Sequence, residues 1–201
     1  DVDIKDISLG MGLDQRIGER FLRAGPAYGG SCFPKDTKAL IETGKQFKTD
    51  LSIVKSVISS NHKRKILLTK KLEEILNGKL KNKIITFLGV TFKPNTDDMR
   101  EASSIPMIKY LNNKNSNVRY YDPSGEKNEF KKLKNVKYSK DILSACLKAD
   151  LIVLHTEWND FKILNFKKIV KKNNFKVFDM RNVYSPTKMK KLKINYFGIG
   201  R

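Results

Sequence analysis

The stretch 83-KIITFLGVTFKPNTDD-98 decides the fold class of this 201-residue chain. Residues 84–90 form a short, nearly continuous apolar run, which is typical of a strand buried on both faces of a parallel sheet. Similar runs recur at 118–121, 151–155, 177–178 and 194–199. Helical patterns lie between these runs, at 104–111, 142–148 and 166–172. Because strands alternate with helices, we predict a doubly wound α/β domain with right-handed crossovers.

The residues that follow the predicted strands are candidates for a ligand site, because ligands of such sheets bind outside the carboxyl ends of the strands. They are Phe92 and Lys93, Asp122 and Pro123, Thr156, Glu157 and Trp158, and residues 179–182. His155 lies inside an apolar run, so we expect a hydrogen-bonded core histidine rather than a ligand. Cys146, on the apolar face of 143-LSACLKAD-150, is expected to pack in the core.

A long helix is predicted over residues 51–80. Apolar side chains recur there near the 3.6-residue period, and 77-NG-78 provides a stop signal. Because this helix joins two unlike regions, we interpret it as a connector between domains and as a candidate dimer surface. His62 lies in the charged stretch 61-NHKR-64 and is expected to face solvent.

Upstream of that helix, 25-GPAYGGSCFPKDTKALIETGK-45 places Cys32 between a glycine pair and a predicted helix start. Pro34 suits the first turn of a helix, and the partial positive charge of a helix N-terminus favours a thiolate over a thiol. Lys35 adds a positive charge nearby, and Asp36 lies one helical turn from the cysteine. A covalent catalytic centre and a buried structural cysteine both remain open on these residues.

The formal net charge of +20 and the pI near 9.9 are typical of proteins that bind nucleic acid or anionic membranes. Lysine is spread over nearly every segment, however, and no basic motif interleaved with aromatic residues occurs, so we expect neither partner. No apolar run is long enough to span a bilayer, and the first residues lack a secretory signal. The two cysteines form no disulfide framework, and no metal site is predicted, so we expect a cytoplasmic protein.

Several segments of the chain resemble the UDP-glucose/GDP-mannose dehydrogenase family. They are 12-GLDQRIG-18, 21-FLRAG-25, 28-YGGSCFPKDT-37, 87-FLGVTFKPNTDDMREASSIPMI-108, 121-YDP-123, 156-TEW-158 and 179-DMRN-182. The resemblance implies that residues 1–50 are the last part of an all-α central dimerisation domain that carries the catalytic cysteine loop. It implies further that residues 51–80 are a connecting helix and that residues 81–201 form a Rossmann-like, parallel-sheet domain that binds the nucleotide sugar.

The resemblance implies an NAD-dependent, four-electron oxidation of a sugar C6 alcohol to a carboxylate. Cys32 would attack the C6 aldehyde and pass through a thiohemiacetal and a thioester, which water cleaves with help from Asp36. Lys35 and Arg100 match family positions that face NAD. The family's NAD-binding domain and its upstream catalytic residues match nothing in these 201 residues, so we expect the chain alone to be inactive.

The resemblance also assigns residues to the nucleotide sugar. Arg16 would reach the sugar site of a neighbouring subunit in a homodimer or larger homo-oligomer. The other substrate positions are Phe21, Leu22, Arg23, Ala24, Gly25, Tyr28, Gly29, Phe92, Lys93 and Arg181. Ala27 stands where many relatives have glycine, which is a mild departure within this loop.

The segments 12-GLDQRIG-18, 92-FKPNTDDMRE-101 and 156-TEW-158 look most like the branch of the family that oxidises UDP-glucose. Dehydrogenases for GDP-mannose or UDP-N-acetyl-mannosamine are alternatives with the same fold. Alternatives of another class are a non-catalytic nucleotide-sugar-binding module, a basic nucleic-acid binder, and a cysteine hydrolase, for which no convincing histidine partner is found.

Overall fold

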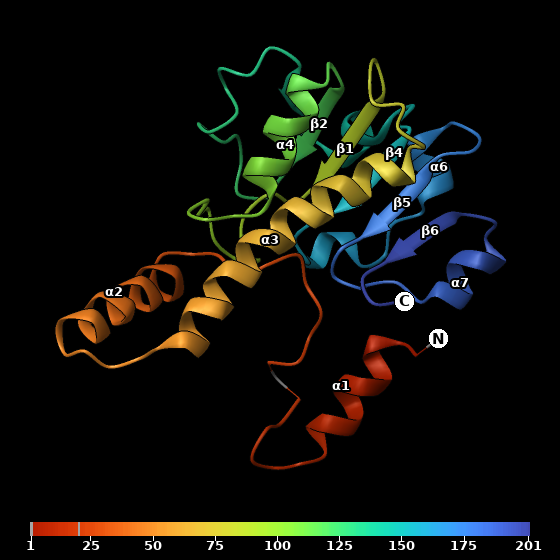
Figure 1. Cartoon of the computed structure of the whole chain (residues 1–201). Helices are drawn as coiled ribbons and strands as arrows, with labels where there is room; N and C mark the ends of the chain where they lie inside the picture. The colour runs from red at the N-terminus through yellow and green to blue at the C-terminus, as the bar shows by residue number, and fades with distance from the viewer. Residues whose placement is uncertain (1, 20) are drawn as a thin grey trace.

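One parallel sheet organises the computed structural model, which describes residues 2–19 and 21–201. The sheet has six strands in the order β3-β2-β1-β4-β5-β6 (Figure 1). They are β1 (Ile84–Leu88), β2 (Asn117–Tyr121), β3 (Val136–Tyr138), β4 (Leu151–Leu154), β5 (Lys176–Asp179) and β6 (Asn195–Gly198). All neighbouring pairs are parallel. The predicted doubly wound α/β fold is confirmed, and its strand order reverses between β1 and β4.

Helices cover both faces of this sheet (Figure 1). They are α3 (Ser52–Ile75), α4 (Ser104–Asn113), α5 (Ile142–Cys146), α6 (Phe166–Val170) and α7 (Pro186–Lys191), with a 3-10 turn, η1 (Asn159–Phe161). Successive strand side chains point to opposite faces. Phe87 therefore packs in the core shared with α3 and α4, whereas Leu88 packs with α5 and α6. Because both faces are covered, the central strands β1 and β4 are apolar except for Thr86, as the sequence indicates.

The two halves of α3 differ in their surroundings. Its C-terminal half enters the core of the sheet, where Leu72 and Ile75 are buried against β1 and α4. Its N-terminal half carries apolar side chains that stay exposed, including Ile53 at 79% and Val57 at 43%. α3 is thus a structural part of the α/β core as well as a connector to the preceding segment.

The segment before α3 contains two helices, α1 (Ile4–Gly12) and α2 (Cys32–Gln46). α2 packs beside the N-terminal half of α3, while α1 lies apart from both, near the C-terminal end of the chain (Figure 1). The backbone N–H of Ile4 donates to the carbonyl of Gly200 (2.9 Å), and Arg201 forms an ion pair with Asp3 (3.1 Å). None of the described helices is long and apolar enough to cross a membrane.

The structure differs from the sequence predictions mainly at short or polar elements. α3 ends at Ile75 rather than near residue 80, because Asn77 and Gly78 both take positive φ angles that end a helix. The predicted helix over 142–148 ends at Cys146, and Lys148 also has a positive φ. β3 and α7 were not predicted, because both lie in lysine-rich stretches without a clear apolar period.

We predict that Leu72→Ala lowers the free energy of unfolding of this chain by about 2–5 kcal/mol, because it leaves a cavity where α3 meets the sheet. The matched control is Leu67→Ala, on the same helix but 63% exposed, which should change the free energy by less than about 0.5 kcal/mol. Urea unfolding followed by circular dichroism measures both. Equal losses for the two variants would show that α3 does not pack on the sheet as described.

Candidate functional site

Cys32 is the first residue of α2, and it is exposed. Ser31 precedes it as the N-cap residue, with its Oγ 3.6 Å from the cysteine Sγ. The chain arrives through Gly30, whose φ of +88° is a conformation that glycine adopts without strain. Pro34 is buried in the first turn, where its missing N–H costs no hydrogen bond. The predicted placement of Cys32 at a helix N-terminus is therefore confirmed.

Two loops from distant parts of the sequence meet behind Cys32: residues 25–30 and residues 92–101. The backbone N–H of Gly30 donates to the carbonyl of Arg100 (2.8 Å). A Cβ added to Gly29 would lie 2.7 Å from the Glu101 carbonyl oxygen and 3.1 Å from the Cβ of Phe92. No side chain fits between these backbones, which explains the glycine pair and brings the cysteine to the carboxyl edge of β1.

Polar side chains of α3 hold the 25–30 loop from the other side. The Asn61 amide accepts from the backbone N–H of Tyr28 (3.0 Å) and donates to its carbonyl (3.1 Å). The Arg64 guanidinium donates twice to the carbonyl of Gly25, at 3.2 and 2.8 Å. The loop before the cysteine is thus anchored at both ends to one helix face.

Two cations lie within electrostatic reach of Cys32. The pKa of the Arg100 guanidinium is raised, first by its hydrogen bond to Asp98 and to a smaller extent by the charge of Cys32. The pKa of Lys35 is raised first by its hydrogen bond to Asp36, at 2.9 Å, with Cys32 again a smaller cause. An anion that approaches the sulfur therefore meets one cation from the 92–101 loop and one from the first turn of α2.

Arg181, which follows β5, is built into the protein beneath this site. Its Nε donates to the carbonyl of His155 (2.9 Å) and its Nη2 to the carbonyl of Phe92 (3.0 Å). Glu157 Oε2 lies 2.9 Å from Nε without an aligned hydrogen bond and acts as a charge partner. Burial lowers the pKa of Arg181, and Glu157 opposes that effect. Because Nη1 lies 2.9 Å from the position of a Cβ on Gly25, this arginine links β1, β4 and β5 to the cysteine loop.

The place where a doubly wound sheet usually receives a phosphate, at the start of the helix after β1, is filled by buried side chains. His155 contacts Ser103 Oγ (2.8 Å) and Thr156 Oγ1 (3.0 Å), and Asp122 accepts from the N–H of Val90 (2.8 Å). Burial lowers the pKa of His155 to about 3, so the ring stays neutral. The prediction of a satisfied core histidine is confirmed, and a ligand has to bind outside this network.

Comparison with known proteins then decides the family. Two sequence patterns of the UDP-glucose/GDP-mannose dehydrogenase family match the chain, the central domain over residues 1–63 and the UDP-binding domain over residues 86–186. The chain belongs to the UDP-glucose/GDP-mannose dehydrogenase family.

Curated relatives agree with this family membership. A UDP-glucose 6-dehydrogenase of Rickettsia felis is 43% identical over 98% of this chain and 45% of its own length. A UDP-glucose 6-dehydrogenase of Rhizobium meliloti is 39% identical over 99% of this chain and 46% of its own length. The chain thus spans about half the length of the curated relatives it matches.

Solved structures agree as well. A UDP-glucose dehydrogenase from the archaeon Pyrobaculum islandicum superposes with a TM-score of 0.83 at 30% identity, over 99% of this chain and 44% of its own. An NDP-N-acetyl-D-galactosaminuronic acid dehydrogenase from Methanosarcina mazei Go1 gives a TM-score of 0.83 at 25% identity, over 100% of this chain and 44% of its own. The dehydrogenase-family fold is therefore shown for the whole described chain.

The structure of this dehydrogenase-family chain brings two groups of predicted residues to one place. The 25–30 loop and the first turn of α2 contribute the first group, which is Gly25, Tyr28, Gly29, Cys32, Lys35 and Asp36. The loop after β1 contributes the second group, which is Phe92, Lys93 and Arg100. Lys93 is exposed, with its ammonium group 5.3 Å from the centre of the Phe92 ring. The roles assigned to these residues by resemblance remain predictions, but their proximity is now established.

The remaining predicted residues lie elsewhere. Arg16 is exposed and bound to Asp14 (2.6 Å), on a turn after α1 that lies apart from α2 (Figure 1). We therefore place Arg16 outside the cysteine site of its own chain. Phe21 is 89% exposed, and Ala24 packs against the core of the sheet. Leu22 and Arg23 line a cavity of about 410 Å³ together with Lys5, Ser8, Leu9 and Glu19.

Sequence reasoning missed the α3 residues that hold the loops, Asn61, Arg64 and Lys65. Their spacing of three and four residues places them on one helix face, which was the available signal. They stand in a charged stretch, however, and such stretches usually face solvent, as the exposed His62 does. Among the residues that the structure describes, no cluster of three His, Cys, Asp or Glu could hold a metal ion.

We predict that iodoacetamide alkylates this chain once, at Cys32, under native conditions near pH 8. Cys146 is fully buried, and burial raises the pKa of its thiol to about 12, so it stays protonated and inaccessible. Mass spectrometry of the intact chain counts the adducts. Cys32→Ser should remove the native adduct, and unfolding in urea should add a second adduct to the wild type. Labelling of Cys146 in the native wild type would contradict this arrangement.

We also predict that Gly29→Ala destabilises the chain by about 1–3 kcal/mol, because the new methyl group would meet the Glu101 carbonyl and the Cβ of Phe92. Gly10→Ala is the matched control, since a Cβ there meets nothing within 4 Å, and alanine within helix α1 should stabilise it by about 0.4–1 kcal/mol. Urea unfolding compares the two variants. A neutral Gly29→Ala would mean that the two loops do not approach as closely as described.

Proposed function

We propose that this chain forms the thiol-bearing and nucleotide-sugar-binding half of an NAD-dependent UDP-glucose 6-dehydrogenase, which oxidises UDP-glucose to UDP-glucuronate. One observation carries the proposal: an exposed cysteine at a helix N-terminus, with Arg100 and Lys35 beside it, at the carboxyl edge of β1 in a chain of this family. The relatives that share about 40% identity over the whole chain are named for this activity.

The charged groups around Cys32 fit a substrate that carries phosphates. Lys93 and Arg100 come from the loop after β1, and Lys35 comes from the first turn of α2. All three are exposed, so Lys93 can bind the diphosphate of the nucleotide sugar through charge-assisted hydrogen bonds, while Lys35 and Arg100 stay available to the cofactor. Phe92 lies directly behind Lys93 and provides an apolar surface against which a sugar ring can pack.

The residues present fit the diphosphate of NAD but not its complete binding site. Lys35 and Arg100 lie beside Cys32 as cations that a diphosphate would contact. 10-GMG-12 lies within helix α1 and therefore does not form the turn of a dinucleotide-binding site. When bound, NAD accepts the hydride in each of the two oxidation steps. We propose that the part of the protein outside this chain holds the remainder of the cofactor.

Cys32 is proposed as the nucleophile of the second oxidation. Its sulfur attacks the C6 aldehyde to form a C–S bond, which gives a thiohemiacetal. Loss of a hydride from C6 converts this adduct to a thioester. Water then attacks the thioester carbon, the C–S bond breaks, and the sugar carboxylate and the free sulfur are released. Sulfur suits both halves of this sequence, because it is a strong nucleophile and a good leaving group.

Asp36 is proposed to orient or activate the water that cleaves the thioester. Its carboxylate is exposed in the first turn of α2 and paired with Lys35 at 2.9 Å, so it can accept a proton from a bound water. The helix N-terminus at Cys32 supplies partial positive charge where negative charge develops on the C6 oxygen during both attacks.

Assembly and compartment follow from the same proposal. The N-terminal half of α3 and the turn after α1 expose apolar side chains, including Ile53, Val57 and Leu13. We propose that a second copy of the protein covers this surface, with Arg16 reaching the neighbouring sugar site. A free, exposed thiol persists in a reducing compartment, so we propose the cytoplasm as its location.

In the natural polypeptide at its full length, Cys32→Ser should reduce NADH formation from UDP-glucose by at least roughly a thousandfold, because the serine hydroxyl is a far weaker nucleophile without a base beside it. Cys146→Ser is the matched control, since Cys146 is buried on the face of the sheet that α5 and α6 cover, away from α3. Its activity per folded molecule should be retained. Absorbance at 340 nm reports turnover. Unchanged turnover by Cys32→Ser would remove Cys32 as the nucleophile.

Calorimetric titration separates the alternative substrates and the non-catalytic alternative. UDP-glucose, GDP-mannose and UDP-N-acetyl-mannosamine are titrated into the chain and into the full-length protein at moderate salt. Selective binding of UDP-glucose supports the proposed substrate, and a preference for another sugar nucleotide changes it. Tight binding without NADH formation by the full-length protein would favour a nucleotide-sugar-binding module.

A further inference from the structure

We propose that Lys65 of α3 is the positioning residue that holds the loop after β1 against the cysteine loop, and thereby sets Arg100 and Gly29 around Cys32. This inference rests on the proposed function for its effect on turnover. The local structural effect can be measured independently.

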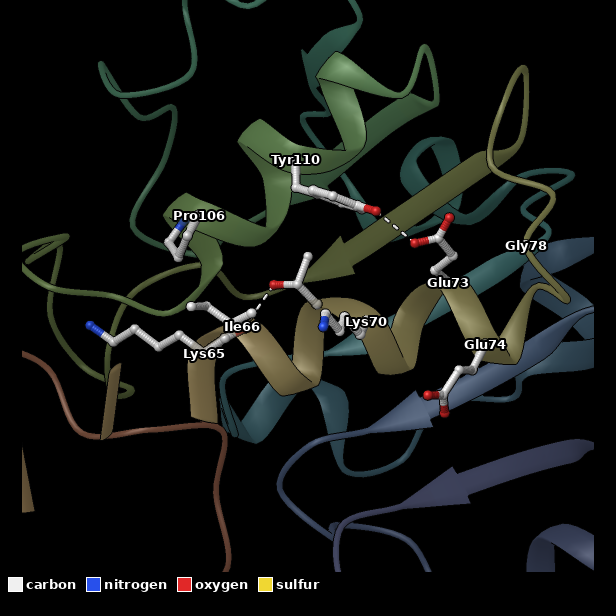
Figure 2. Close-up of a pocket in the computed structure, with 9 residues that line it drawn as sticks. Lys65, Ile66, Lys70, Glu73, Glu74, Gly78, Pro106 and Tyr110 are labelled. Atoms are coloured by element: carbon white, nitrogen blue, oxygen red, sulfur yellow. Dashed lines mark hydrogen bonds between the residues drawn. The ribbon is translucent and has the colours of Figure 1, made fainter. Parts of the chain in front are cut away.

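Lys65 is a buried lysine whose ammonium group makes two hydrogen bonds to one neighbour, Glu101. Its side chain is 10% exposed, and its Nζ donates to both the backbone carbonyl (2.9 Å) and the carboxylate (3.1 Å) of Glu101. In Figure 2 Lys65 points away from the Glu73–Tyr110 hydrogen bond, and all three residues line a groove of about 610 Å³ between α3 and α4. The ammonium group of Lys65 therefore binds the loop after β1, although its side chain lines the groove.

Glu101 needs an anchor because its backbone is strained. Its φ is +55°, in the left-handed region that side chains other than glycine and asparagine seldom adopt. The Lys65 ammonium binds the carbonyl of this residue, so it stabilises the backbone conformation itself and not only the side chain. The pKa of the Glu101 carboxyl is lowered, with the hydrogen bond from Lys65 as the largest cause.

The anchored carbonyl lies at the point where the two loops meet. It is the oxygen that a Cβ on Gly29 would approach to 2.7 Å, and the preceding carbonyl, of Arg100, accepts the N–H of Gly30 (2.8 Å). If Glu101 moved out of its left-handed conformation, both contacts would change together. Arg100 and the backbone directly before Cys32 would then lose their mutual placement.

Lys38 offers a matched control on the same carboxylate. Its Nζ lies 3.3 Å from Glu101 Oε1, but its side chain is 62% exposed and it has no contact with the Glu101 carbonyl. An exposed ion pair of this kind contributes little to stability. Lys38→Met and Lys65→Met therefore remove the same charge from the same partner, and only Lys65→Met removes the backbone anchor.

Two measurements test the proposal. The first is amide hydrogen exchange of this chain, in which Lys65→Met should speed the exchange of the Gly30 N–H at least tenfold, roughly the loss of one hydrogen bond, while the Phe87 N–H within β1 is unchanged. The second is NADH formation from UDP-glucose by the full-length protein, in which Lys65→Met should lower kcat by roughly tenfold to a hundredfold through misplacement of the reacting groups. Lys65→Arg should restore most of both, and Lys38→Met should stay within about twofold of the wild type.

The outcomes are distinct. If folded Lys65→Met matches Lys38→Met in Gly30 exchange and in kcat, or if folded Lys65→Arg restores neither, the proposal is wrong. If Lys65→Met does not fold, Lys65→Gln replaces it, because the amide keeps a polar end in the buried position but is too short to reach Glu101, and the same changes are expected. A wild-type protein without dehydrogenase activity would overturn the proposed function, and the Gly30 exchange would still decide the role of Lys65.

Discussion

The cysteine site depends on the close approach of two backbones, at Gly29 and Gly30 in one loop and at Arg100 and Glu101 in the other. The Gly30 N–H is bound to the Arg100 carbonyl, and there is no space for a Cβ at Gly29. Glycine permits this approach because it has no side chain and tolerates positive φ. The contact joins the helical segment that carries Cys32 to the edge of the sheet, so the exposed thiol is placed by the α/β domain and not by its own helix alone.

Helix α3 supports this contact in two ways, through apolar packing on the sheet and through polar contacts to the loops. Its C-terminal half buries Leu72 and Ile75 in the core of the sheet, and this apolar packing fixes the helix position. A polar face about two to three turns before Leu72 presents Asn61, Arg64 and Lys65 to the backbones of both loops. Side-chain hydrogen bonds to loop carbonyls satisfy groups that no strand or helix pairs, and they fix the loops relative to a rigid element.

At the carboxyl edge of the sheet, the buried polar groups are already hydrogen-bonded, whereas the outer charged groups are exposed to solvent. His155 and Thr156 hydrogen-bond each other, and Asp122 and Thr156 each hydrogen-bond the backbone after β1, so these polar groups are already occupied. Arg181 closes the same region by binding two loop carbonyls. The exposed cations Lys35 and Arg100 lie outside this closed layer, beside Cys32, and the exposed Lys93 lies over the ring of Phe92. The arrangement separates the groups that stabilise the edge from the groups available for chemistry.

The sequence by itself determined the fold class and the placement of Cys32 at the N-terminus of a helix. The apolar runs predicted five of the strands and their doubly wound parallel arrangement, because strands buried on both faces need nearly continuous apolar residues. The strand β3 was missed because its lysine-rich segment lacks that pattern. The helix start at Cys32 could also be predicted from the sequence, since the neighbouring glycines and proline have local backbone preferences.

Only the tertiary structure decided which distant groups meet. The substrate role of Arg181 stays a prediction, but only the structure shows that its guanidinium binds the carbonyls of His155 and Phe92. The loop contacts of Asn61, Arg64 and Lys65 were not predicted. The physical reason is that a long polar side chain has the same local sequence pattern whether its partner is water or a backbone carbonyl from another segment. Periodicity records which face of α3 a residue occupies, whereas its partner depends on where the loops cross that face.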